Sequence, residues 1–251
     1  MNDLVLTHLV DRVLTVSLNR PGKRNALSLE LIEALAAAVE DARAGVESRE
    51  VRVVVLAGEG EVFCAGMDLQ GVMSDVPAMT RMLRTLARTA VRIRALSCPT
   101  ISRVQGAAVG GGCGLMVVTD FAFTHPEARI GYPEVTLGLT PAVVAPWLMR
   151  KIGPGKARAV LLSGGTMTGA DAHAMGIADS VAAADELVAR VAEFAQKLTA
   201  GGPQAQGVTK RWLNELDGSL DESIAMRAAT LSAEVIASPE AQQSLRRLFG
   251  E

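Results

Sequence analysis

Three short segments of the chain carry residues that could do chemistry together. The stretches 63–69 and 106–114 are rich in glycine and small residues, and a Pro-Glu pair, Pro133-Glu134, follows them. Glycines that open a helix leave backbone N–H groups unpaired beside the positive end of the helix dipole, and they let a ligand approach closely. Two such segments facing each other could stabilise a developing oxyanion. Each segment alone is also explained by tight helix packing, and a lone Pro-Glu pair by a surface glutamate at a helix start.

Other common chemistries lack their residues. Neither glycine segment matches GxGxxG in frame or carries the lysine of a phosphate-binding loop, so nucleotide binding is poorly supported. The cysteines form no CxxC pair and the histidines are scattered, which predicts small buried thiols and no disulfide framework, nucleophilic dyad or metal site. These residues are Cys64, Cys98, Cys113, His8, His125 and His173.

Composition restricts the class of protein. The chain has 251 residues, 49% hydrophobic and 3% aromatic, with a net charge of −2. It can therefore bury a core, but it lacks the basic excess and the aromatic rings that nucleic-acid binding uses. The longest uncharged run, 104–119, is too short for a membrane span, and no signal peptide is visible. We expect a cytoplasmic protein with neither nucleic acid nor membrane as partner.

Hydrophobic periodicity predicts the elements that must position the three segments. Two strands around Asp11-Arg12 suit a hairpin, a β-branched run at 51–57 suits a buried strand, and Ser28 is a helix N-cap. Further strands are expected at 100–105, 121–124 and 129–131. Helices are expected at 29–45, 77–95, 114–119, 146–152, 186–198, 204–216, 220–237 and 239–249. The change of pattern predicts a mixed α/β core over 1–183 and a helical region over 184–251.

Five motifs in order and spacing resemble the enoyl-CoA hydratase/isomerase (crotonase) superfamily. They are 20–27 (RPGKRNAL), 51–58 (VRVVVLAG), 63–69 (FCAGMDL), 105–113 (QGAAVGGGC) and 133–139 (PEVTLGL). The agreement runs from about residue 13 to residue 237. The resemblance implies an α/β fold, a spiral of ββα units, with C-terminal helices that build homotrimers, often paired into hexamers.

The resemblance also implies an acyl-CoA thioester as substrate, so that coenzyme A is part of the substrate and no separate cofactor is expected. The backbone N–H groups of Met67 and Gly111 would form an oxyanion hole for the thioester carbonyl. The nucleotide end of CoA would lie against Lys23, Arg24, Ala26, Ala65, Asp68 and Leu69. We expect Asp68 to hold its loop by accepting backbone N–H groups.

Two residues near the C-terminus have alternative interpretations. Lys210 and Arg211 resemble a basic pair of the family that can reach a neighbouring subunit's nucleotide. A solvated helix face explains them equally well.

One carboxylate stands where hydratases of this family usually have two. The first position is Gly114 and the second is Glu134. In a hydratase, Glu134 would have to activate the water as a base and return its proton to C2. An isomerase needs only one carboxylate to move a proton from C2 to C4, so these two residues alone favour isomerisation.

A closer resemblance favours hydration. The stretches 112–115 (GCGL) and 137–146 (LGLTPAVVAP) look like the bacterial branch of methylglutaconyl-type hydratases, which also has glycine at the first position. We therefore expect an enoyl-CoA hydratase. A Δ3,Δ2-enoyl-CoA isomerase and a non-catalytic acyl-CoA-binding homologue are the alternatives. Hydrolase or dehalogenase chemistry would need a further acid in the pocket, for which Asp75 and Glu127 are candidates.

Overall fold

A six-stranded sheet forms the centre of the molecule. The computed structural model describes residues 3–70 and 75–249. The strand order is β1-β2-β3-β4-β6-β9. β1 and β2 pair antiparallel, as the predicted hairpin, and every other neighbouring pair is parallel. The strands are β1 (Val5–Val10), β2 (Val13–Leu18), β3 (Val53–Gly58), β4 (Thr100–Val104), β6 (Phe121–Thr124) and β9 (Ser180–Val181).

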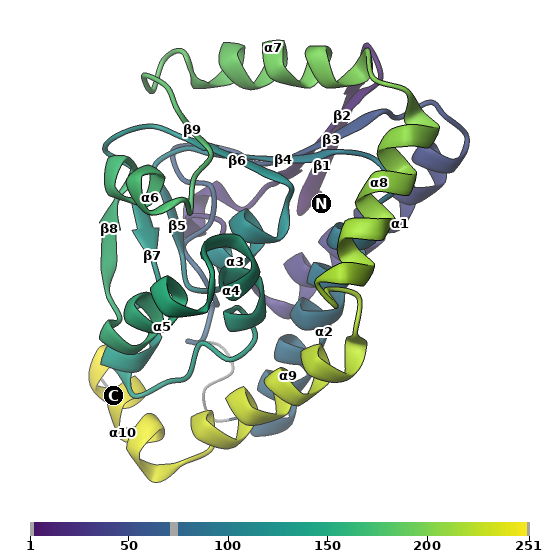
Figure 1. The fold of residues 1–251 in the computed structure, drawn as a ribbon. Coiled ribbons are helices and arrows are strands. Elements are labelled where there is room, and N and C mark those ends of the chain that lie inside the picture. Colours follow the sequence, from purple (N-terminus) through teal and green to yellow (C-terminus); the bar gives the residue numbers. More distant parts are fainter. Residues whose placement is uncertain (1–2, 71–74, 250–251) are drawn as a thin grey trace.

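A smaller sheet stands beside the first, at the left of Figure 1. It consists of β5 (Ala107–Val109), β7 (Arg129–Gly131) and β8 (Thr166–Thr168), in that order. The chain passes from β4 to β5 and from β6 to β7, and in each case a helix follows. Strands of the two sheets therefore alternate with helices as ββα units, which confirms the predicted crotonase-like α/β fold.

The helices lie close to their predicted limits. The Ser28 hydroxyl accepts a hydrogen bond from the Leu31 N–H (3.3 Å), as expected of an N-cap. The sequence predicts no element at 153–183, where the structure has two helices and two strands. The helices are α1 (Leu29–Glu47), α2 (Val76–Ala95), α3 (Gly111–Val118), α4 (Ala145–Ile152), α5 (Pro154–Ser163), α6 (Gly169–Met175), α7 (Leu187–Thr199), α8 (Pro203–Leu216), α9 (Glu222–Ile236) and α10 (Pro239–Phe249), with short 3₁₀ helices η1 (Pro21–Lys23) and η2 (Glu134–Leu137).

β3 is apolar on both faces because it separates two hydrophobic cores. Val54 and Leu56 belong to the main core, which α1 and α2 also enter. Val53 and Val55 face the opposite way and pack with Val191 of α7. In Figure 1 this helix lies along the side of the large sheet that α1 and α2 leave open. The uninterrupted run of β-branched residues is typical of such a doubly covered parallel strand.

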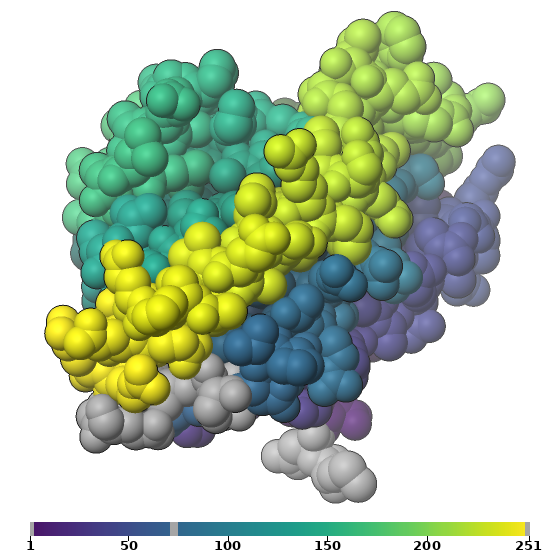
Figure 2. Space-filling model, turned by 90° about the horizontal axis from the view of Figure 1, so that it is seen from below, coloured from purple at the N-terminus to yellow at the C-terminus, as the bar shows by residue number. Residues whose placement is uncertain are grey.

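The C-terminal helices return to the first half of the chain. α9 packs along α2, and α10 lies near η2. Seen from below in Figure 2, these helices form a band across the molecule. Lys210 of α8 anchors the start of this region, since its ammonium group donates to Asp120 Oδ2 (2.7 Å) and to the Cys98 carbonyl (2.9 Å). The division at residue 184 stays a prediction.

The cysteines and the search for a membrane-spanning helix test two predictions made from the sequence. All three cysteines are buried and free, as predicted, and burial raises the pKa of the Cys64 and Cys113 thiols to about 12. No helix within residues 3–70 and 75–249 combines the length and the apolar character needed to cross a membrane. A cytoplasmic location stays a prediction.

Candidate functional site

Backbone pairing brings the two glycine-rich segments together. The N–H of Cys64 donates to the carbonyl of Ala107 (3.0 Å), and the N–H of Val109 donates to the carbonyl of Cys64 (3.1 Å). The turns that follow these paired residues contain Met67 and Gly111. A Cβ placed on Gly111 would lie 3.6 Å from Cγ of Met67, so the two residues are in contact distance.

The N–H groups of Met67 and Gly111 are unpaired within the described residues. Gly111 is the first residue of α3, and the first N–H groups of a helix have no acceptor inside it. Leu27 forms a short backbone bridge with the residues on either side of Met67. Its N–H donates to the Gly66 carbonyl (2.7 Å), and its carbonyl accepts from the Asp68 N–H (3.0 Å). The Met67 N–H therefore points to the other side of this short bridge. Both groups can donate to a ligand.

Glu134 reaches this place because Gly110 has no side chain. Gly110 has a φ of +53°, and a Cβ on it would lie 2.9 Å from Oε1 of Glu134. The other carboxyl oxygen, Oε2, is shielded from solvent and accepts no hydrogen bond from the residues described. Glu134 is the first residue of η2, as that alternative has it, but its shielded Oε2 shows that the carboxyl is not a solvated surface group.

Burial makes the Glu134 carboxyl a weaker acid than an exposed glutamate. It raises the pKa of this carboxyl from 4.5 to about 7, because desolvation disfavours the charged form. No cation contributes to the shift. A carboxyl with a pKa near neutrality can both take and return a proton at pH 7, which is the property that a single acid–base residue needs.

A cavity of about 220 Å³ contains all three groups. Five of the residues predicted for the site line it: Ala65, Met67, Leu69, Gly111 and Glu134. Residues 137–144, part of the stretch 137–146 that the sequence indicates as shaping the acyl pocket, form another wall. The sequence did not indicate the walls from α2 and from Ser232, Ile236 and Leu248 of the C-terminal helices. Because a helix face that lines a cavity and one that packs in a core have the same apolar periodicity, no signal in the sequence distinguished them.

The two further acids considered from the sequence lie outside this cavity. Asp75 caps α2, since its carboxylate accepts from the Ala78 N–H (2.9 Å). Glu127 is exposed and lies 3.2 Å from Nδ1 of His125. Neither position supports the hydrolase or dehalogenase alternative.

Val144 fills the place beside Gly114, the position at which hydratases of the family usually carry their first glutamate. A Cβ on Gly114 would overlap Cγ1 of Val144. Val144 also lines the cavity that contains Glu134. Next to Gly114, where the sequence lacks a second glutamate, the cavity wall is therefore formed by packed hydrocarbon.

The residues predicted to contact CoA lie on two neighbouring loops. The N–H of Ala65 donates to the carbonyl of Arg24 (3.0 Å), which ties the loop containing Lys23 and Ala26 to the turn before Met67. Lys23 and Arg24 are exposed. Their role in binding CoA, and that of Ala65 and Leu69, stays a prediction.

Asp68 holds its loop, but through a different partner than expected. Its carboxylate accepts from the Arg20 guanidinium at 2.6 Å and from no backbone N–H among the described residues. Arg20 also donates to the carbonyl of Ala26 (3.0 Å). The ion pair therefore joins both loops on which CoA binding was predicted.

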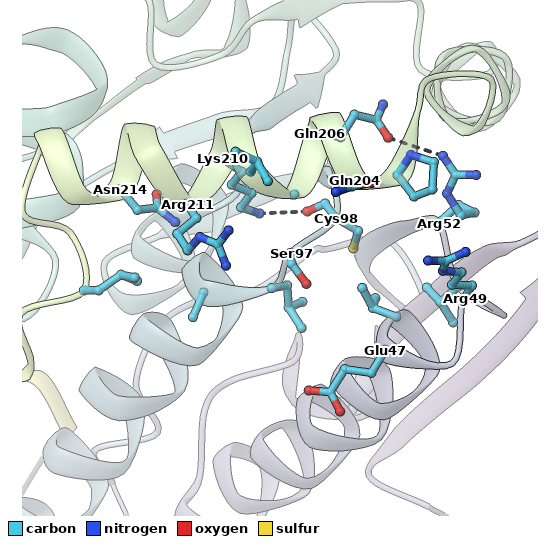
Figure 3. Close-up of a pocket in the computed structure, with 18 residues that line it drawn as sticks. Glu47, Arg49, Arg52, Ser97, Cys98, Gln204, Gln206, Lys210, Arg211 and Asn214 are labelled. Carbon is cyan, nitrogen blue, oxygen red and sulfur yellow. Dashed lines mark hydrogen bonds between the residues drawn. The ribbon is translucent and has the colours of Figure 1, made fainter.

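A larger cavity of about 550 Å³ lies elsewhere, between the ends of α1 and α2 and the side of α8 (Figure 3). In Figure 3 Lys210 extends from α8 to the carbonyl of Cys98. Lys210 is only 8% exposed and is paired with Asp120, so it is neither a solvated residue nor free to reach another subunit. Arg211 is exposed and lines this cavity. We assign the site to the smaller cavity because it contains the buried carboxyl.

No metal site accompanies these groups. Within the described ranges, no three His, Cys, Asp or Glu side chains are grouped so that they could hold a metal ion. The chemistry available is therefore that of one carboxyl and two backbone donors beside an apolar cavity.

Comparisons with known proteins identify the family of this chain. A sequence model of the family Enoyl-CoA hydratase/isomerase matches residues 10–248. The chain belongs to this family. The 2,3-dehydroadipyl-CoA hydratase of Escherichia coli is 31% identical over 216 residues, which cover 86% of this chain and 83% of the relative.

Solved structures of the enoyl-CoA hydratase/isomerase family have the same fold. An enoyl-CoA hydratase/isomerase from Xanthobacter autotrophicus superposes with a TM-score of 0.86 at 28% identity, covering 98% of this chain and 94% of that one. One from Pseudoalteromonas atlantica gives 0.84 at 27% identity, covering 98% and 97%.

The raised pKa of Glu134 predicts how stability depends on pH. This carboxyl binds a proton more tightly in the folded chain (pKa about 7) than in the unfolded one (4.5), so its contribution is full below pH 4.5 and is lost as the pH rises through 7. Relative to the wild type, Glu134→Gln should therefore gain about 2.5 kcal/mol between pH 5 and pH 8 in urea unfolding. Glu127→Gln, whose carboxyl is exposed with a lowered pKa, should show no such gain. Parallel curves for wild type and Glu134→Gln would contradict the burial argument.

The packing of Val144 on Gly114 predicts a coupled pair. Gly114→Ala should destabilise the protein by about 2 kcal/mol, because overpacking a core outweighs the gain in helix propensity. In the double variant with Val144→Ala, the loss in the free energy of unfolding should be smaller than the sum of the two single losses by at least about 1 kcal/mol. Thermal or urea unfolding measures both. Gly155→Ala is the control, since a Cβ there meets nothing within 4 Å; equal effects at 114 and 155 would refute the close packing.

Proposed function

We propose that this protein is an enoyl-CoA hydratase with a single acid–base residue. Glu134 takes a proton from a water molecule whose oxygen bonds to C3 of a 2-enoyl-CoA. The electron pair of the double bond moves to the thioester oxygen, and the N–H groups of Met67 and Gly111 stabilise this enolate. Glu134 then returns its proton to C2, so that one water is added and the enzyme is regenerated.

One observation carries the proposal. The buried Glu134 carboxyl, with a pKa of about 7 and a free Oε2, lines the same small cavity as two unpaired backbone donors. Preorganised donors at a developing oxyanion contribute about 3–4 kcal/mol each. A carboxyl that titrates near neutrality accepts and returns a proton with little energetic cost at pH 7.

Within the family, we propose that the catalytic residues of this chain are those of the methylglutaconyl-type branch of hydratases. Gly114 and the stretch 137–146 support it, because Val144 of that stretch packs on Gly114 where a second glutamate would otherwise stand. The name of the Escherichia coli relative, a hydratase, agrees with hydration as the reaction.

Isomerisation of a 3-enoyl-CoA is the second candidate. The hydrocarbon wall formed by Val144 favours it, since among the described residues no second carboxyl lines the cavity to help activate a water molecule. Glu134 would remove a proton from C2, the dienolate would be held by the same two N–H groups, and the proton would return at C4.

We also propose that the chain forms a homotrimer or a dimer of trimers. Large apolar side chains are exposed on α8 and α9, where a monomer would leave them in water. They include Trp212 (56% exposed), Leu216 (65%) and Leu231 (46%). Exposed large apolar side chains gathered on two neighbouring elements of the chain are typical of an interaction site.

The masses of the products distinguish the reactions. Incubated with 2-hexenoyl-CoA, the wild type should yield a product heavier by one water; incubated with 3-hexenoyl-CoA, an isomerase would instead give a product of unchanged mass with a shifted double bond. Glu134→Gln should lose at least about 100-fold in kcat, since it removes the proton acceptor. It should still bind hexanoyl-CoA in calorimetry, whereas Glu127→Gln should keep full turnover. Binding without any conversion by the wild type would favour the non-catalytic alternative.

The assembly is tested by sedimentation. The wild type should sediment as a trimer or hexamer, and Leu216→Asp should shift it to smaller species, because a carboxylate in an apolar interface is costly. Leu162→Asp is the matched control, since Leu162 is 70% exposed and lies on a different helix, α5. A monomeric wild type would refute the assembly.

A further inference from the structure

The backbone bridge to Leu27 determines where the N–H of Met67 points. The N–H of Leu27 donates to the carbonyl of Gly66, and the carbonyl of Leu27 accepts from the N–H of Asp68. The residues on both sides of Met67 are thus fixed to the same partner. Any displacement of the bridge turns the Met67 N–H with it.

Leu27 also contacts the second backbone donor of the site. Its side chain is fully buried, and its Cδ1 would lie 3.2 Å from a Cβ placed on Gly111. The main chain of Leu27 therefore pairs around one donor while its side chain packs against the other. In a close-packed interior, the position of Leu27 fixes the spacing between the N–H groups of Met67 and Gly111.

Arg20 holds the two strands of this bridge together. Its Nη1 donates to the carbonyl of Ala26, the residue before Leu27, at 3.0 Å. The same nitrogen donates to Oδ2 of Asp68, the residue after Met67, at 2.6 Å. One guanidinium nitrogen thus connects the positions directly next to Leu27 and Met67.

The main chain of Arg20 is itself held by a buried side chain. The N–H of Arg20 donates to Oδ1 of Asn25 (2.8 Å). Nδ2 of Asn25 donates to the carbonyls of Glu59 (2.9 Å) and Val62 (2.7 Å), and Asn25 is fully buried. The guanidinium group therefore starts from a fixed backbone, as a group that positions another one requires.

The ion pair also neutralises a charge that would oppose the reaction. Formation of the enolate places negative charge on the oxygen beside the Met67 N–H. The side chain of Asp68 is only 22% exposed, so water screens its carboxylate incompletely. Without Arg20, this carboxylate would repel the enolate from the adjacent residue.

We infer that the ion pair between Arg20 and Asp68 positions the Met67 N–H for the oxyanion, with Arg20 also cancelling the charge of Asp68. The inference rests on the proposed function for the oxyanion itself. Neither residue lines the cavity that contains Glu134, so both are positioning residues that act through the bridge.

The carbonyl stretch of a bound thioester reports the oxyanion donors directly. Hexanoyl-CoA, isotope-labelled at the carbonyl carbon, should absorb at lower wavenumber on the wild type than in solution, because two N–H groups polarise the C=O bond. Arg20→Met should lose most of this shift. Its kcat with 2-hexenoyl-CoA should fall at least about 10-fold, since small misplacements of a catalytic group are costly.

Variants of Asp68 separate position from charge. Asp68→Asn keeps the shape of the side chain and leaves no unpaired carboxylate, so it should lose less of the shift and of kcat than Arg20→Met. The double variant Arg20→Met/Asp68→Asn should regain part of the kcat that Arg20→Met loses. A double variant no faster than Arg20→Met overturns the role assigned to charge.

A second ion pair provides the matched control. Lys151 and Asp179 are also partly buried and paired, and neither lines the cavity with Glu134. Lys151→Met should leave the carbonyl band and kcat as in the wild type, even where it lowers the midpoint of urea unfolding.

The outcomes distinguish the inference from the proposed function. If Arg20→Met and Asp68→Asn retain the full wild-type shift, or change only the Kd of hexanoyl-CoA, the inference is overturned and the hydratase proposal stands. If the carbonyl absorbs on the wild type as it does in solution, the oxyanion hole is overturned as well.

Discussion

The site depends on keeping one carboxyl group out of water without giving it a counter-ion. Glu134 lies against the backbone of Gly110, with Oε2 shielded and no cation contributing to its pKa. Elsewhere the chain pairs its partly buried acids: Asp68 with Arg20, and Asp120 with Lys210. A carboxyl left unpaired in apolar surroundings is costly, so its retention beside two free backbone donors points to use in proton transfer.

The fold positions these groups through the same backbone hydrogen bonds that hold the two sheets together. The bridge between Cys64 and Ala108 ties the exit of β3 to β5, and β5 pairs with β7, directly before the Pro133-Glu134 turn. Three loops are thereby held by hydrogen bonds within a few residues of Met67, Gly111 and Glu134. Since the positioning comes from main-chain contacts, the side chains around the cavity can change without moving the reacting groups, and they are free to determine which acyl group fits.

The sequence predicted the elements well because their signals are local. The strand at 53–58, the N-cap at Ser28 and the four C-terminal helices follow from period, capping and proline position. The burial of Glu134 could not be read from a Pro-Glu pair, because it depends on Gly110, 24 positions earlier, lacking a Cβ. Lys210 was seen as a surface or binding residue, whereas its partner Asp120 lies 90 positions away. Contacts between residues this far apart in the sequence produce no periodic pattern from which they could be predicted.

The contact between Gly114 and Val144 connects the missing acid to both the reaction and the substrate. A side chain at position 114 would require the side chain at 144 to retreat, so the absence of an acid at 114 and the hydrocarbon wall depend on the same packing. In the hydratase proposed above, Glu134 would act alone as base and acid, and its pKa of about 7 suits both roles. The same wall removes polar surface from the place where an acyl chain has to lie. The proposed proton transfer by a single residue and the hydrocarbon character of this wall therefore have a common origin in the packing of Val144 on Gly114.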